Sequence, residues 1–122
     1  MKNFRDLKVW EKSHQVTLEV YKLTTDFPKD ERFGLVSQMR RCAVSVPSNI
    51  AEGCGRRGNG EFHKFLQIAT GSANELEYQI LLARDLSFVS DAAHKNLSDK
   101  IIEVQKMLAG LIAKVDEERF KK

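Results

Sequence analysis

Residues 97–115 read LSDKIIEVQKMLAGLIAKV, and their apolar side chains recur every three or four positions. The stripe is made of Leu97, Ile101, Val104, Leu108, Leu111 and Val115. This spacing places them on one face of an α-helix, which completes a turn every ~3.6 residues. Because such a stripe needs apolar partners, the segment predicts an all-α protein whose core forms between helices.

The same periodicity continues through the rest of the 122-residue chain, divided by two prolines and one glycine-rich stretch. We expect helices at about 7–25, 30–52, 59–86 and from Ser90 almost to the C-terminus, with Asp30 and Asn59 as N-terminal caps. Short loops make consecutive helices antiparallel neighbours. The sequence therefore predicts one domain over residues 1–122, an antiparallel up-down-up-down four-helix bundle.

Pro47 lies inside the second expected helix. Proline has no N–H to donate to the carbonyl of Ala43, and its ring crowds that carbonyl. We therefore expect helix two to be kinked at Pro47, with Ser45, Ser48 and Asn49 available to satisfy the freed backbone groups.

The first expected helix is apolar on two faces. One stripe contains Leu7, Trp10, His14, Leu18 and Tyr21, and the other contains Val9, Val16, Val20 and Leu23. A monomeric bundle buries one stripe per helix. One interpretation is a wide core face with scattered exposed apolar residues. The interpretation we favour is a homo-oligomer whose subunits meet through the second stripe, Val9, Val16, Val20 and Leu23.

Composition excludes several classes of protein. No apolar run reaches the ~18 residues of a membrane span, and the N-terminus has no apolar segment of the secretory type. The two cysteines, Cys42 and Cys54, are too few for a disulfide framework. We expect a cytoplasmic protein with reduced thiols. The net charge of +3 permits an anionic partner.

No group of residues predicts catalysis, a cofactor or a metal. GCGRRG at 53–58 has the G-x-G-x-x-G pattern, but dinucleotide binding needs a preceding strand and here a helix precedes it. Glu11 and His14 have a Glu-x-x-His spacing, yet the similar pair at 91–94 starts at the opposite end of the bundle. Cys54 has no obvious histidine base. We therefore expect a protein that is not an enzyme.

Positive charge gathers in the middle of the chain, at Arg40, Arg41, Arg56, Arg57 and Lys64. Arginine matches phosphate in a bidentate way, so we predict a surface that contacts the nucleic-acid backbone. The same cations could instead be solvated, or paired with Glu52 or Glu75. No aromatic residues alternate with these arginines, so base stacking is not predicted.

Three stretches carry a resemblance to a known family: FRDLKVW at 4–10, QMRRCAVSVPSNIAEG at 38–53, and the segment from EF at 61–62 to FLQIATGSANEL at 65–76. They resemble the small four-helix-bundle proteins encoded within intervening sequences of bacterial 23S ribosomal RNA genes. The chain is similar, more distantly, to the accessory protein of diversity-generating retroelements, a basic pentamer that partners a reverse transcriptase and nucleic acid. The resemblance implies a ring-shaped homopentamer and brings no catalytic residues.

Two hypotheses about function follow from these observations. The first is a non-enzymatic, oligomeric, nucleic-acid-associated protein, RNA being the first candidate and DNA the second. The alternative is a structural scaffold whose oligomer binds a protein partner.

Overall fold

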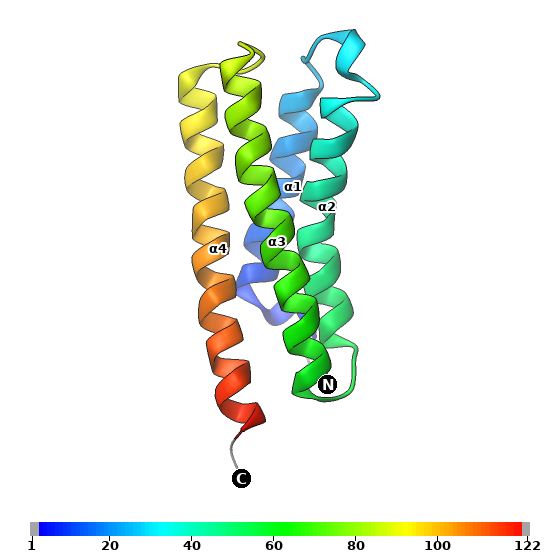
Figure 1. Ribbon diagram of the computed structural model, residues 1–122, viewed down its shortest axis with the longest axis vertical. Helices are drawn as coiled ribbons and strands as arrows, with labels where there is room; N and C mark the ends of the chain where they lie inside the picture. Colours follow the sequence, from blue (N-terminus) through cyan, green and yellow to red (C-terminus); the bar gives the residue numbers. More distant parts are fainter. Residues whose placement is uncertain (1–2, 121–122) are drawn as a thin grey trace.

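The computed structural model describes residues 3–120, in which four α-helices make up the body of the molecule. The helices are α1 (Lys8–Thr24), α2 (Leu35–Cys54), α3 (Gly58–Asp85) and α4 (Asp91–Arg119). Short 3-10 helices, Phe4–Asp6 and Lys29–Glu31, precede α1 and α2. Figure 1 shows the helices side by side, joined alternately at opposite ends, with α1 and α3 on opposite corners. The predicted all-α four-helix bundle is confirmed, and the described residues contain no strand.

All four helices contribute to one apolar core. The stripe of α4 faces inward, with Leu111 the half-buried exception. The largest fully buried apolar side chains are Met39, Ile50, Leu66, Leu76, Ile80, Ile101 and Leu108. Burial of a side chain of this size contributes about 1.5–3 kcal/mol relative to exposure, so these interhelical contacts supply the main favourable free energy of folding. Within residues 3–120, no helix is both long and apolar enough to cross a membrane.

Two predicted caps are wrong, and the true helix starts explain why. Asp30 lies inside the 3-10 helix, and the neighbouring Glu31 accepts the Leu35 N–H at 3.2 Å instead. Asn59 lies within the first turn of α3, where its amide donates to Glu118 of α4 at 3.3 Å. Helix α3 begins one residue earlier, at Gly58, whose φ of 78° disfavours any side chain.

Helix α2 continues through Pro47 as one element, and the carbonyl freed by the proline is satisfied from another helix. The hydroxyl of Thr17 on α1 lies 2.9 Å from the Ala43 carbonyl oxygen and 2.9 Å from that of Ser13 on its own helix, and its single proton is shared between the two acceptors. The expected local donors act elsewhere: the Asn49 amide bonds the carbonyl of Ser45 at 2.8 Å. The prediction that residues beside the proline satisfy the Ala43 carbonyl was therefore wrong. The kink at Pro47 stays a prediction.

Gly53 permits the close approach of α2 to α3. A Cβ atom at this position would lie 2.9 Å from the Phe62 ring and 3.0 Å from Cβ of Phe65. Real Cβ atoms essentially never lie closer than 3.0 Å to such a neighbour. A larger residue would therefore push the start of α3 away from α2.

The two stripes of α1 lie the opposite way round from the prediction. Val9, Val16 and Val20 are between 0 and 5 % exposed in the single chain, so they form core and offer no surface to a second subunit. Leu23 is half-buried against the core. Of the bulkier stripe, Leu18 is 57 % and Tyr21 is 42 % exposed, whereas Leu7 and Trp10 are half-buried against the core.

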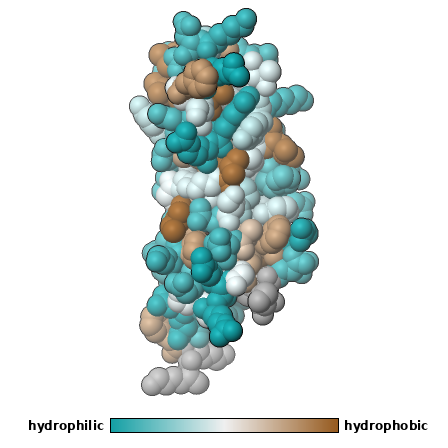
Figure 2. Space-filling model, turned by 90° about the vertical axis from the view of Figure 1, so that its right-hand side faces the viewer, coloured by the Kyte–Doolittle hydropathy of each residue, from teal (hydrophilic) through white to brown (hydrophobic). Residues whose placement is uncertain are grey.

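On the face that Figure 2 shows, the outward apolar residues do not join into one large patch. On the face where α2 lies, Figure 2 shows brown apolar islands separated by hydrophilic residues. The exposed apolar side chains on α1 and α2 are Leu18, Tyr21 and Val44, and those on α3 are Ile68, Tyr78 and Leu81. Any contact with another molecule therefore combines small apolar areas with polar ones.

We predict that Thr17→Val lowers the free energy of unfolding by about 1–3 kcal/mol, because the buried Ala43 carbonyl loses its donor. Urea denaturation measures the change. The control is Pro47→Ala, which restores a backbone N–H that can reach Ala43, so Thr17→Val should cost less in that background. An equal cost in both backgrounds would contradict the role given to Thr17.

We predict that Val20→Asp unfolds the protomer, because it places a charge without a partner in the core at a cost of several kcal/mol. Circular dichroism at increasing temperature measures the loss. Leu18→Asp, two residues away on the exposed side, is the matched control and should keep its helix content. A cooperatively folded Val20→Asp protein would refute the inward placement of this stripe.

Candidate nucleic-acid interface

Arg40 lies on α2 and is hydrogen-bonded to α1 near one end of the bundle. Its Nε donates to the Thr24 hydroxyl at 3.0 Å, and Nη2 donates to the Tyr21 carbonyl at 3.2 Å. The guanidinium carbon lies 4.7 Å from the centre of the Tyr21 ring. Three contacts fix this arginine, yet several of its five N–H groups remain available to a ligand.

Arg41 follows on the exposed side of α2, where its Nη2 donates to the Ser37 hydroxyl at 3.2 Å. Across residues 3–120, no carboxylate forms an ion pair with Arg40 or Arg41, so the pairing with Glu52 or Glu75 considered from the sequence does not occur. Neither arginine is therefore held in a direct ion pair, although Glu75 lines the neighbouring groove together with Arg41.

The two arginines border an open hollow between α1 and the start of α2, about 390 Å³ in volume. Five further residues line it. Arg32 lies beside the 3-10 helix with its guanidinium 5.4 Å from the centre of the Phe33 ring. The lining residues are Tyr21, Arg32, Phe33, Val36, Ser37, Arg40 and Arg41, which we call the arginine hollow. It combines three cations with two aromatic rings and contains no carboxylate.

The other predicted cations lie at the opposite end of the bundle. Arg56 follows α2 and pairs with Glu52 at 3.3 Å, so part of its charge is neutralised. Arg57 and Lys64 are exposed at the start of α3. The distance along the helix axis from Arg41 to the end of α2 is ~20 Å, because an α-helix rises ~1.5 Å per residue. The structure thus brings Arg40 and Arg41 together and separates them from Arg56, Arg57 and Lys64.

Sequence reasoning missed Arg32, Phe33 and Tyr21. It found no aromatic residues alternating with the arginines along the chain, but in the folded protein Arg40 lies over the Tyr21 ring, and Arg56 lies 5.1 Å from the centre of the Phe65 ring. The adjacent Arg-Phe pair at 32–33 was a usable signal. The Tyr21 contact was not, because it joins two helices.

A polar groove runs between α2 and α3, on the other side of Arg41. The hydroxyls of Ser45 and Ser72 lie 2.7 Å apart across it. Burial raises the pKa of the Cys42 thiol to about 12, and the carboxylate of Glu75 adds to this rise. Cys42 is therefore protonated at neutral pH and is a poor nucleophile.

The remaining titratable groups do not assemble into a reactive centre. His63 is half-buried, and its Nδ1 lies 2.6 Å from Oδ1 of Asp116. His14 stacks on Trp10 with ring centres 5.1 Å apart. In the described part of the chain, no cluster of three or more His, Cys, Asp or Glu side chains is placed to hold a metal.

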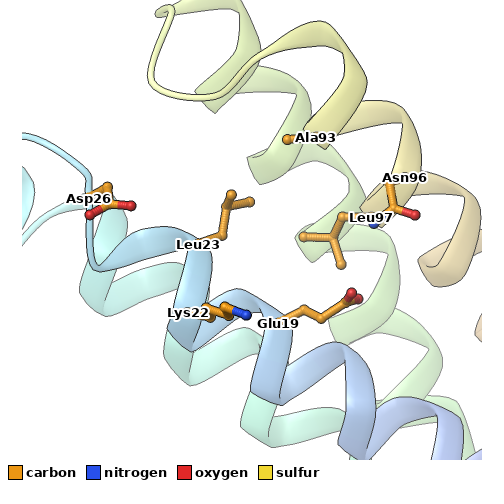
Figure 3. Close-up of a pocket in the computed structure, with 7 residues that line it drawn as sticks. All are labelled: Glu19, Lys22, Leu23, Asp26, Ala93, Asn96 and Leu97. Atoms are coloured by element: carbon orange, nitrogen blue, oxygen red, sulfur yellow. The ribbon is translucent and has the colours of Figure 1, made fainter.

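A second open groove, about 270 Å³ in volume, lies between α1 and α4. Figure 3 shows Leu23 and Leu97 approaching one another across it, with Lys22 and Glu19 along the edge on α1. The charges around this groove offset one another: Glu19 pairs with Lys100 at 2.6 Å, and Lys22 and Asp26 both line it. The lining of the arginine hollow has only positive charges, so we place the candidate interface at the hollow.

Comparison with known proteins agrees with this fold. A solved structure from Bacteroides thetaiotaomicron, a protein of unknown function from the S23 ribosomal protein family, is 24% identical to this chain. It superposes with a TM-score of 0.77, and the match covers 85% of this chain and 97% of the other. No curated protein matches. The family model described as 23S rRNA-intervening sequence protein matches residues 5–110. The chain therefore belongs to the 23S rRNA-intervening sequence protein family.

Proposed function

We propose that this chain is a non-enzymatic, oligomeric, nucleic-acid-associated protein that contacts the phosphate backbone. The observation that carries the proposal is the arginine hollow, where Arg32, Arg40 and Arg41 line one surface without a carboxylate partner. Guanidinium groups bind phosphate oxygens through paired hydrogen bonds, and charge-assisted bonds of this kind are the strongest in proteins. RNA is the first partner to test, because the family is described by an intervening sequence of 23S rRNA.

The arrangement of the hollow supports backbone contact rather than readout of a sequence. Arg40 is held in place by Thr24 and Tyr21, so little side-chain entropy is lost when it binds a phosphate. Contacts to phosphate carry no base information. Binding should therefore be similar for unrelated sequences and should weaken steeply as salt increases.

Two separate apolar surfaces support an oligomer. A ring needs a heterologous contact, in which each subunit presents two different patches to its neighbours. Leu18 and Val44 supply one patch on α1 and α2. Ile68 supplies the other on α3, which stands at the opposite corner of the bundle from α1 (Figure 1). The pentameric state we propose rests on the family resemblance, and repetition of the hollow around a ring would raise the overall affinity.

The absence of an enzymatic role is also part of the proposal. The thiol of Cys42 is held protonated by burial and by Glu75, so it is unsuited to covalent catalysis. If nucleic-acid binding fails, the same apolar patches favour the scaffold function, with a protein partner in place of nucleic acid.

The oligomer is tested by light scattering coupled to size exclusion, which should give a mass about five times the 13.9 kDa protomer. Leu18→Asp and Ile68→Asp should each reduce the mass, because a charge in either patch opposes the same contact. Ala113→Asp, on the exposed side of α4, is the control and should leave it unchanged. A protomer mass for the parent at micromolar concentration would end the oligomer proposal.

Nucleic-acid binding is tested by removing two charges from either end of the bundle. Arg32→Ala with Arg41→Ala should lower the affinity for unrelated RNAs about tenfold or more, and should reduce the slope of log affinity against log salt by about two. Arg56→Ala with Arg57→Ala removes the same charge at the other end and should have the smaller effect. Equal losses in both variants would mean that net charge, rather than the hollow, attracts nucleic acid.

A further inference from the structure

The most exposed large apolar side chain of the described chain lies in the arginine hollow. Phe33 is 87 % exposed, just after the 3-10 helix Lys29–Glu31 and just before α2. A ring in this position adds almost nothing to the core. Isolated exposed apolar residues are common, but this one lies beside three unpaired cations and a second partly exposed ring, that of Tyr21.

Each ring in the hollow is paired with an arginine. The Arg32 guanidinium carbon lies 5.4 Å from the centre of the Phe33 ring, and that of Arg40 lies 4.7 Å from the centre of the Tyr21 ring. Guanidinium groups and aromatic rings are both flat surfaces on which a nucleobase stacks. Arg40 is also hydrogen-bonded to Thr24, so its side of the hollow is formed before a ligand arrives.

The hollow is large enough to enclose part of a nucleic-acid strand. Its volume of about 390 Å³ falls in the range of sites that bind small organic molecules. Val36, which is buried, provides an apolar floor, and Ser37 places a hydroxyl at the edge next to Arg41. A base lying on a ring would leave its own phosphates within the field of the arginines.

We propose that the arginine hollow selects single-stranded nucleic acid, by stacking unpaired bases on Phe33 and Tyr21 while Arg32, Arg40 and Arg41 hold the adjacent phosphates. This inference rests on the proposed function and specifies which form of nucleic acid, single-stranded or double-stranded, the site binds. In a duplex, the bases are stacked on one another and present only their edges and the backbone, so the rings of the hollow have no base face to contact. A single strand uses both the rings and the cations.

The test measures fluorescence anisotropy of the full-length protein with a short single strand of mixed sequence, prepared as RNA and as DNA, and with each strand annealed to its complement. The parent should bind the single strands more tightly than the duplexes at the same salt concentration. Phe33→Ala should lower single-strand affinity about five- to a hundredfold, the equivalent of losing one stacked base, and should change duplex affinity less than about twofold.

The chain provides a matched control in Phe120. This ring is also highly exposed and also lies beneath an arginine, with the Arg119 guanidinium carbon 5.1 Å from its centre, but it follows α4 at the other end of the molecule. Phe120→Ala should leave binding to both kinds of strand unchanged. Unlike Arg32→Ala with Arg41→Ala, Phe33→Ala should keep the parent's slope of log affinity against log salt, since it removes no charge.

The outcomes separate this inference from the proposed function. Equal binding of single strands and duplexes with a steep salt dependence would leave backbone contact standing and would overturn strand selection. An effect of Phe33→Ala that is the same for both kinds of strand, or the same as that of Phe120→Ala, would overturn it as well. Failure of the parent to bind any of the probes at low salt would end both proposals. Preference between the RNA and DNA single strands then identifies which of the two the site accepts.

Discussion

The hydrogen bond from the Thr17 hydroxyl to the Ala43 carbonyl joins α1 to α2 at the proline, and the arginine hollow is built on the same two helices. Pro47 leaves the carbonyl without its helical donor, and a buried carbonyl without a partner is costly. Thr17 is therefore held level with Ala43. The two helices run in opposite directions, so the next two turns of α1 approach the start of α2. There the Tyr21 carbonyl and the Thr24 hydroxyl accept hydrogen bonds from the Arg40 guanidinium.

Much of the fold is predictable from the sequence, because buried apolar side chains in a bundle follow the helical repeat. The stripe of α4 could be assigned from spacing alone, and so could the number of helices. The two stripes of α1 could not be told apart in this way. Val16 and Leu18 are similarly apolar, and which of them faces inward depends on the width of the gap between helices, a tertiary property.

The candidate site was only half predictable for a related reason. Arg40 and Arg41 are adjacent in sequence and are neighbours on one helix, so grouping them was correct. Adding Arg56 was wrong, because the length of α2 separates it from Arg40 and Arg41. The hollow is built from α1, the connection at 32–33 and the first turns of α2. Tyr21 contacts Arg40 from nineteen residues away, and no local pattern encodes that pairing.

The stability of the bundle and the properties of the hollow come from different residues. Core side chains such as Ile50, Leu66 and Leu108 supply the burial that folds the chain. By contrast, Arg32 and Arg41 have no anionic partner, and three like charges around one hollow repel one another, so this arrangement weakens the fold slightly rather than strengthening it. Residues that break local rules without a stabilising gain are the ones to expect at a binding site. An anionic strand would remove that repulsion and cover the exposed ring of Phe33, whereas a neutral protein surface would cover the ring and leave the charges unpaired. The nucleic-acid partner that we propose therefore fits the charges of the hollow better than a neutral protein surface does.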